Sequence, residues 1–230
     1  MPIKQTRRSM LKGVALTGTV TLGSTTAITQ SRADHSSSTT NLEIKGQNAD
    51  RSSGGSRYEV WTTGEIRKDG STEPDDSVYN SGDTHYAEGT IRMGTGKSDY
   101  YEFEGQAIKF YVERASWADD TSWTYFIFDN DLDYTGHDCI DIIGYNGSSY
   151  GCGDNSVQMN CTGSFEKPGD GSLESCDTVD GSYADSQTED GGHDHFEMNG
   201  EFTSMRMGIG DPETDNPGEI KLERELGCSW

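Results

Sequence analysis

The sequence predicts an all-β protein, an antiparallel β-sandwich built from two related β repeats, and three observations carry this prediction. Apolar residues alternate with polar ones in most of the patterned segments, which is the period of a half-buried strand. No segment after residue 33 sustains an apolar period of 3.6 residues, so no amphipathic helix is expected. Four segments of the first half match four segments of the second half in the same order.

Residues 1–33 are expected to form an export signal. Residues 6–12 read Thr-Arg-Arg-Ser-Met-Leu-Lys, which resembles the twin-arginine signal with Arg7 and Arg8 as the pair. A weakly apolar stretch follows over residues 14–28, and Ser31-Arg32-Ala33 forms a small-x-small cleavage site. We therefore expect cleavage after Ala33, a flexible linker over residues 34–40 and a secreted, extracellular protein.

The charge of the chain predicts its surroundings. The 230 residues contain 18 basic and 40 acidic side chains, a net charge of −22. Five of the basic residues and none of the acidic ones lie in residues 1–33, so the mature chain has 13 bases against 40 acids, a net charge of −27. Self-repulsion of this size destabilises a compact state in dilute buffer. At ~1 M salt the Debye length is only ~3 Å, which screens the repulsion and predicts a salt-adapted, halophilic protein.

The same composition excludes several partners. Nucleic acid is not expected as a partner, because phosphate binding needs a basic face. No run of ~18 apolar residues exists that could span a membrane. The first cysteine is Cys139 and the chain ends without an apolar tail, so we expect no lipid or C-terminal membrane anchor.

The sandwich domain is expected over residues 41–230, and its sequence contains a diverged internal duplication. Repeat one covers about 42–112, repeat two about 140–207, and a joining strand lies at 117–128. The matched segments are 42–48 with 140–146, 58–68 with 157–167, 76–78 with 177–179, and 100–112 with 195–207. A shared β composition would be the alternative explanation of these matches. One repeat buries too little surface to be stable alone, so we expect both to pack into a single sandwich.

Two features refine this picture. The joining segment is apolar on both faces, which is typical of a strand in the middle of a packed structure. Gly105 and Gly200 each lie between two alternating runs, where a tight turn or bulge requires a residue that tolerates positive φ.

The first repeat also resembles a known type of module. Tyr58 to Ile66, Glu88 to Ile91 and Asp99 to Gly105 resemble a β module found in many exported haloarchaeal proteins. Together with the signal and the acidity, the chain resembles twin-arginine-exported, salt-adapted haloarchaeal secreted proteins. The resemblance implies habitat and fold, but no activity, because this module occurs in proteins of varied function.

Five cysteines predict covalent cross-links. They are Cys139, Cys152, Cys161, Cys176 and Cys228, and no two of them form a Cys-x-x-Cys motif. Outside the cell this favours two disulfide bonds and one free thiol, while the connectivity stays open. Cys161 falls inside an expected strand, so we expect its partner on a neighbouring strand or in an adjoining loop.

An acidic motif is the candidate metal site. Asp129, Asp131 and Asp133 occupy positions 1, 3 and 5 of a segment that follows an expected strand, a spacing used by calcium loops. Tyr134 stands where glycine is expected and Ile140 where a bidentate glutamate is expected. The alternative is a solvated acidic turn. Apart from calcium at this motif, no cofactor is expected.

Two further motifs carry metal-binding side chains. His137 and Cys139, and likewise His193 and His195, are two residues apart and so share a face of a strand. If the two strands were neighbours, these four side chains could hold Zn²⁺ or Cu²⁺. The alternative is two polar strand ends with Cys139 in a disulfide. The aligned first repeat has Ser98 and Tyr100 in place of the two histidines.

The functional prediction is a non-catalytic binding or cell-surface interaction module. No Gly-x-Ser-x-Gly elbow and no phosphate-binding glycine loop is present. Four Trp and eleven Tyr could supply flat faces for a carbohydrate or a cell-surface component, and the alternative is that they belong to the core, as aromatic residues of a small sandwich more often do. Trp61 is the best candidate, because Asn160 takes its place in the second repeat. The alternatives are a secreted hydrolase acting on polysaccharide and a disulfide-stabilised antimicrobial protein.

Overall fold

The structure is a computed structural model that describes residues 39–47, 55–70, 72, 75–92, 98–114, 122–129, 136–145, 155–169, 173, 175–209 and 218–228. The expected signal, its cleavage site and most of the expected linker lie outside the described residues. Thr39 and Thr40, expected in the linker, already belong to the first strand. No helix capable of crossing a membrane is found in the part of the chain that the structure describes.

The described residues form sixteen strands, eight from each half of the chain. The first half contains β1 (Thr39–Gln47), β2 (Gly55–Thr62), β3 (Ile66–Lys68), β4 (Ser77–Ser81), β5 (Thr84–Arg92), β6 (Ser98–Glu104), β7 (Ala107–Arg114) and β8 (Ser122–Asp129). The second half contains β9 (His137–Tyr145), β10 (Asn155–Cys161), β11 (Ser164–Glu166), β12 (Thr178–Asp180), β13 (Tyr183–Thr188), β14 (His193–Asn199), β15 (Phe202–Ile209) and β16 (Glu219–Leu226).

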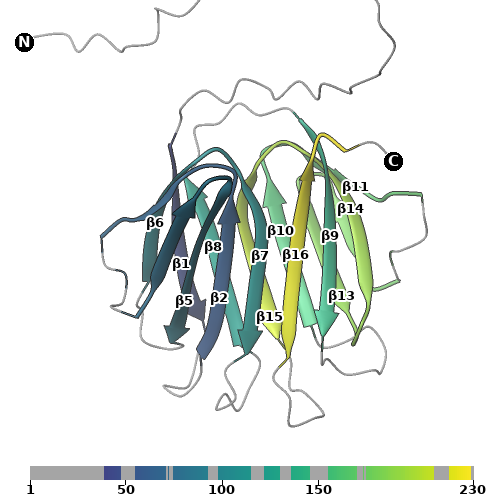
Figure 1. Ribbon diagram of the computed structural model, residues 1–230. Helices are drawn as coiled ribbons and strands as arrows, with labels where there is room; N and C mark the ends of the chain where they lie inside the picture. Colours follow the sequence, from purple (N-terminus) through teal and green to yellow (C-terminus); the bar gives the residue numbers. More distant parts are fainter. Residues whose placement is uncertain are drawn as a thin grey trace, which may run out of the picture. The chain divides into compact units, whose positions relative to one another are not determined.

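These strands form two antiparallel eight-stranded sheets that pack face to face as a β-sandwich. Sheet A has the order β12-β13-β10-β15-β8-β1-β6-β3, and sheet B has the order β11-β14-β9-β16-β7-β2-β5-β4. In Figure 1 the strands β2, β7, β16 and β9 of sheet B lie side by side in one layer, with β1, β8 and β10 of sheet A in the other. The all-β prediction is therefore confirmed.

The strand order also shows the two related repeats. When every strand is exchanged for the one eight places away in the chain, the order of sheet A becomes that of sheet B read in reverse. Each repeat thus supplies four strands to each sheet, and the repeats meet where β15 pairs with β8 and where β16 pairs with β7. The expected joining strand is β8, the last strand of repeat one, and its counterpart β16 lies beyond the range 140–207 that the sequence matches covered.

A single apolar core lies between the sheets. It draws side chains from both repeats, including Leu42, Phe126, Ile142 and Leu222. At its centre Phe110 of sheet B meets the rings of Phe126, Phe128 and Phe202 of sheet A edge-on, with centroids 5.2–6.0 Å apart. Because this cluster joins β7 and β8 to β15, the core continues across the boundary between the two repeats.

Gly105 and Gly200, the glycines between alternating runs, have the positive φ that the sequence predicted. Gly105 has φ = 75° and Gly200 has φ = 102°. In each repeat a threonine opposite, Thr63 or Thr162, accepts a backbone hydrogen bond from the residue after the glycine, at 2.9 and 3.0 Å. A Cβ atom at either glycine would collide with that threonine hydroxyl, so both positions require glycine.

One cross-strand pair shows how the repeats diverged while keeping their packing. Tyr58 pairs with Gly89, and at the equivalent place in repeat two Val157 pairs with Ser186. The Tyr58 hydroxyl occupies the space above Gly89 and donates to buried Asp99 at 3.0 Å. In repeat two the Ser186 hydroxyl donates to Asp194 at 2.6 Å.

The buried hydroxyl of Tyr58 is held in its neutral form. Burial, and after it the nearby Tyr101 and Asp99, raises the pKa of Tyr58 far above its usual range. The phenol therefore remains protonated and able to donate to the carboxylate. Tyr58 in repeat one and Ser186 in repeat two thus satisfy the equivalent carboxylates, Asp99 and Asp194, with different side chains.

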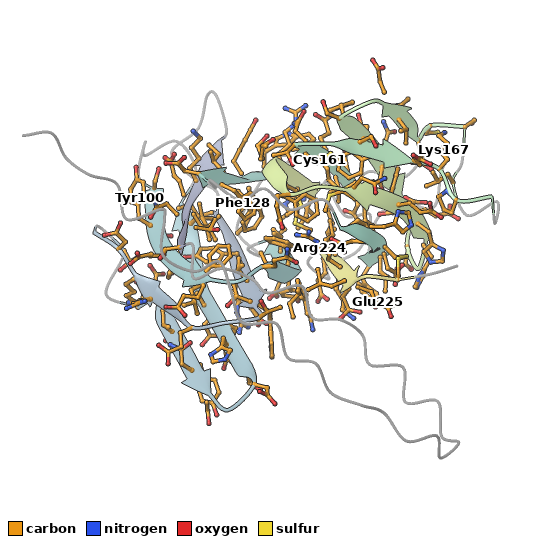
Figure 2. All side chains as sticks on the ribbon, turned by 90° about the horizontal axis from the view of Figure 1, so that it is seen from above. Tyr100, Phe128, Cys161, Lys167, Arg224 and Glu225 are labelled. Carbon is orange, nitrogen blue, oxygen red and sulfur yellow. A yellow bond between two sulfur atoms is a disulfide. The ribbon has the colours of Figure 1, made fainter. Side chains whose placement is uncertain are left out.

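A charged cluster lies where the repeats meet. Arg224 is 5 % exposed and donates to Asp138 at 2.7 Å and to Glu201 at 2.8 Å. Glu201 also accepts a hydrogen bond from Gln106, its own counterpart in repeat one. Figure 2 shows Arg224 and Phe128 near one another between the two repeats. Burial opposes the charge of Arg224, but the two carboxylates outweigh it and raise the pKa of Arg224.

Four of the five cysteines lie in the described part of the chain, Cys152 lies outside it, and one expectation about them needs correction. Cys139 of β9 is bonded to Cys228, which follows the neighbouring β16. Cys176 is also disulfide-bonded. Cys161 is free, so the expectation that it pairs across strands is wrong. Its side chain points into the apolar core, and burial raises the pKa of its thiol.

Candidate functional site

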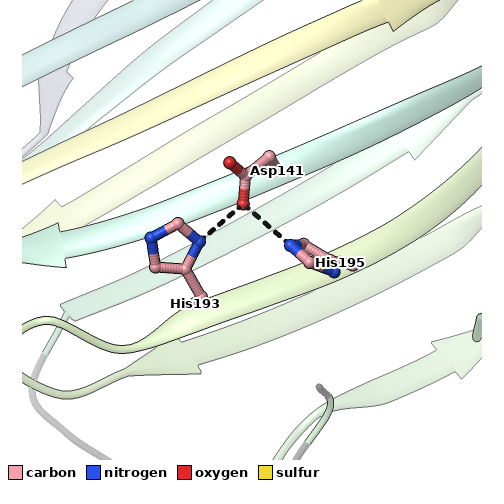
Figure 3. Close-up of side chains that lie close together, drawn as sticks. All are labelled: Asp141, His193 and His195. Atoms are coloured by element: carbon pink, nitrogen blue, oxygen red, sulfur yellow. Dashed lines mark hydrogen bonds and ion pairs between the residues drawn. The ribbon is translucent and has the colours of Figure 1, made fainter. Parts of the chain in front are cut away.

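Three metal-binding side chains meet on the outer face of sheet B. Asp141 lies on β9, and His193 and His195 lie on the neighbouring β14, with His195 directly opposite Asp141. One Asp141 carboxylate oxygen lies 3.1 Å from His193 Nδ1 and 3.3 Å from His195 Nε2 (Figure 3). The ligand atoms of all three lie within 4.8 Å of one another. We call these residues the Asp141 trio.

Strand alternation positions the trio. Asp194 lies between the two histidines, is buried and accepts a hydrogen bond from Ser186. Fixing Asp194 on the inner face places His193 and His195 on the outer face, because successive side chains of a strand point to opposite sides. His193 is exposed, whereas His195 and Asp141 are half-buried. The trio is therefore open to solvent.

Repeat one has the same arrangement with different chemistry. The counterparts of Asp141, His193 and His195 are Glu43, Ser98 and Tyr100. One Glu43 carboxylate oxygen accepts hydrogen bonds from Ser98 Oγ at 2.7 Å and from the Tyr100 hydroxyl at 3.3 Å. A carboxylate bound by two side chains of the next strand thus occurs in both repeats. Of the two arrangements, that of repeat two alone has a metal-ligating side chain at all three positions, one aspartate and two histidines.

The trio lies at one end of a row of side chains that crosses sheet B. Each member pairs with the next in the strand register. In order the row is Tyr79 (β4), Tyr86 (β5), Trp61 (β2), Lys109 (β7), Glu223 (β16), Asp141 (β9) and His195 (β14). Seven strands at a spacing of about 4.8 Å give the row a length of about 29 Å. We call it the sheet B row.

The other end of the sheet B row is aromatic. Trp61 stacks on Tyr86 with ring centroids 4.7 Å apart, and Tyr86 contacts Tyr79 at 5.3 Å. The ammonium group of Lys109 lies 5.1 Å from the Trp61 ring centroid and 3.7 Å from a Glu223 oxygen. Tyr79 is 47 % exposed, because its strand β4 is at the edge of the sheet.

Sheet A carries a plainer row at the equivalent positions. There Asn160 takes the place of Trp61, Ser204 that of Lys109 and Asp180 that of Tyr79, while Tyr183 keeps an aromatic ring at the position of Tyr86, as the strand registers show. Asn160 donates a hydrogen bond to Ser204 at 3.2 Å. The two outer faces therefore share a backbone plan, but only sheet B combines an aromatic cluster with a histidine–carboxylate cluster.

The structure brings together only part of the histidine and cysteine set that the sequence suggested. The strands β9 and β14 are neighbours, as that site required. However, Cys139 is bonded to Cys228 and is unable to ligate a metal. His137 lies opposite Asn199 and contacts Glu197 at 3.4 Å, away from the two other histidines. Asp141 takes the third position instead, which only the strand register could identify.

The acidic calcium motif is described only at its first residue. Asp129 is exposed at the end of β8. Asp131 and Asp133 lie outside the described residues. Calcium at Asp129, Asp131 and Asp133 therefore stays a prediction.

A small, partly open pocket adjoins the buried cluster where the repeats meet. Its volume is about 10 Å³, and Thr40, Gln106, Glu201 and Arg224 are among the residues that line it. Thr40 Oγ1 and Gln106 Oε1 are buried and have no hydrogen-bond partner among the residues that the structure describes. This space is about that of one water molecule, which could bond to both oxygens.

Comparison with known proteins identifies no relative of this chain. No family model, no curated protein and no solved structure matches the chain. The Asp141 trio and the sheet B row are therefore interpreted from their own contacts.

Proposed function

We propose that the protein is an exported, salt-adapted, non-catalytic binding module that uses the outer face of sheet B to hold a carbohydrate-containing component of the cell surface. One observation carries this proposal: the sheet B row combines aromatic, cationic and anionic side chains, and the equivalent row of sheet A does not. The outer face of sheet A has a cation–aromatic contact of its own, with Arg206 4.4 Å from the Trp123 ring, but at the positions equivalent to the sheet B row it has no cation. A change of residue class at equivalent positions is expected where one face has acquired a partner.

The contacts at the aromatic end suit a sugar. Trp61 stacks on Tyr86, Tyr79 contacts Tyr86 at a tilt of 30°, and Tyr79 is the most exposed of the three rings, so we expect a ligand to contact Tyr79 first. Tyrosine offers an apolar ring and a polar hydroxyl together, which matches the mixed surface of a sugar. Lys109 and Glu223 follow in the same row and can donate to and accept from hydroxyl groups.

The sequence indicates the environment in which the outer face of sheet B would bind its partner. The arginine pair at Arg7 and Arg8 supports export, and the excess of acidic residues supports a medium of high salt. In such a medium long-range charge attraction is screened. Contacts by ring stacking and hydrogen bonding therefore become the effective means of recognition.

Removal of the aromatic end should weaken binding to cell envelopes. In the double variant Trp61→Asn/Tyr79→Asn, asparagine replaces Trp61, as it does at the equivalent position 160 of repeat two. The second substitution removes the exposed ring of Tyr79. The affinity of the double variant for envelopes isolated from the producing cells, in ~2 M NaCl, should fall about fivefold or more, since each lost aromatic contact costs roughly 0.5–1.5 kcal/mol. Cosedimentation measures the retained fraction.

The matched control is Tyr100→Asn on the outer face of sheet A, where Tyr100 is 39 % exposed. This control should be retained like the wild type. Equal retention of the wild type and the double variant would contradict the proposed binding face.

A further inference from the structure

We propose that the Asp141 trio binds one divalent transition-metal ion of the Zn²⁺ class. This proposal is independent of the binding function given above. The nitrogen atoms of His193 and His195 and an oxygen of Asp141 would supply three ligands, and water would complete the coordination on the solvent side.

The distances of the trio suit such an ion. Zn–N and Zn–O bonds are about 2.0–2.2 Å, so neighbouring ligands of a tetrahedral site lie ~3.3 Å apart. The two nitrogen-to-oxygen distances are 3.1 and 3.3 Å. The imidazole rings stand nearly perpendicular, at 88°, with centroids 6.1 Å apart. Small ring rotations would therefore turn the hydrogen-bonded trio into a ligand set, with no movement of β9 or β14.

The backbone also favours chelation. His193 and His195 are two residues apart on one strand, so both side chains project from the same face. Asp141 projects from the adjacent strand directly opposite His195. A three-ligand set held by two paired strands is pre-organised, which lowers the entropic cost of binding.

The first repeat provides the second, independent observation. Glu43, Ser98 and Tyr100 form the same hydrogen-bonded arrangement without any imidazole. The fold is therefore satisfied by two hydroxyl groups at these positions and does not require histidines there. Repeat two has both histidines together with a carboxylate, which is the combination that Zn²⁺ and Cu²⁺ prefer.

The same ligand set selects against the ions that an acidic protein attracts without specificity. Mg²⁺ and Ca²⁺ prefer a shell of oxygen ligands, and two of the three ligands here are nitrogen atoms. Zn²⁺ binding at the trio should therefore persist when Mg²⁺ is present in large excess. This separates the trio from the many surface carboxylates of the chain.

Titration calorimetry tests the proposal. The mature protein, stripped of metal with a chelator, is titrated with Zn²⁺ in ~2 M NaCl with excess Mg²⁺. The wild type should bind one Zn²⁺ per chain in a saturable manner. The variant His193→Ser/His195→Tyr, which copies the residues of repeat one, should bind at least about 100-fold more weakly, because it lacks two of three ligands.

Two controls keep the outcome decisive. His137→Ser removes a histidine from the same face outside the trio and should bind Zn²⁺ like the wild type. The circular dichroism spectrum of each variant should match that of the wild type, as expected from the hydroxyl-bonded trio of repeat one. Absence of saturable Zn²⁺ binding by the wild type would overturn the proposal, and so would equal binding by a folded His193→Ser/His195→Tyr variant.

Discussion

Replacement of Arg224 by methionine should lower the free energy of unfolding by about 3–5 kcal/mol, which is the cost of breaking a buried ion pair by removing one partner. Arg224 and its two carboxylate partners are nearly inaccessible to solvent, with side-chain exposures of 1 % for Arg224, 0 % for Asp138 and 3 % for Glu201. The variant leaves both carboxylates buried without their cation. Salt cannot screen these charges effectively, so the loss should appear in ~2 M NaCl as well. Denaturant unfolding followed by circular dichroism measures it.

The first repeat supplies a matched control for this prediction. The strand registers place Phe128, Thr40 and Gln106 at the positions equivalent to Arg224, Asp138 and Glu201. The triple variant Arg224→Met/Asp138→Thr/Glu201→Gln therefore approximates the neutral set of repeat one. It removes the stranded charges and should recover more than half of the stability lost by Arg224→Met. A triple variant less stable than the single variant would contradict this account of the cluster.

Transfer from ~2 M to ~0.05 M salt should unfold the mature protein. The Debye length grows from about 2 Å to about 14 Å over this range, so acidic side chains on the same face begin to repel one another. With 13 bases against 40 acids, most carboxylates have no cation to pair with. Unfolding relieves the repulsion by moving these charges apart.

Circular dichroism provides the measurement, and return to high salt is the control. The β signal should disappear at low salt and reappear when salt is restored. Dilution leaves the disulfide bonds intact, so the chain can refold. An unfolding midpoint that is equal at both salt concentrations would show that charge repulsion has no part in the stability of this fold.

Much of the fold could be predicted because it depends on local alternation. Segments such as Tyr101 to Glu104 alternate with period two, and β6 and β7 lie where this pattern indicates. The matches between the halves also predicted the two related repeats. The match between the last strands of the two repeats was harder to recognise, because β8 has Phe128 and β16 has Arg224 at the equivalent core position. A buried charge at an apolar position hides the correspondence from any comparison of residue types.

The candidate site was predictable only in part. The spacing of His193 and His195 places both on one face of a strand, whatever that strand pairs with. The third member depends on register: a shift of one residue between β9 and β14 would have replaced Asp141 by a buried neighbour. The disulfide of Cys139 likewise depends on the pairing of β9 with β16, which are far apart in the chain. Such long-range pairings are properties of the assembled sheet, and local sequence does not determine them.

The most direct test of the central claim, that the outer face of sheet B is the binding surface, is oxidative footprinting of the protein bound to cell envelopes. Tyr79 and Tyr100 are exposed to similar extents, 47 % and 39 %, on the outer faces of sheets B and A respectively. Mass spectrometry of the bound and free protein in ~2 M NaCl compares their labelling rates. The account predicts that binding slows the labelling of Tyr79 and leaves that of Tyr100 unchanged. Protection of Tyr100 alone, or equal protection of both tyrosines, would contradict it.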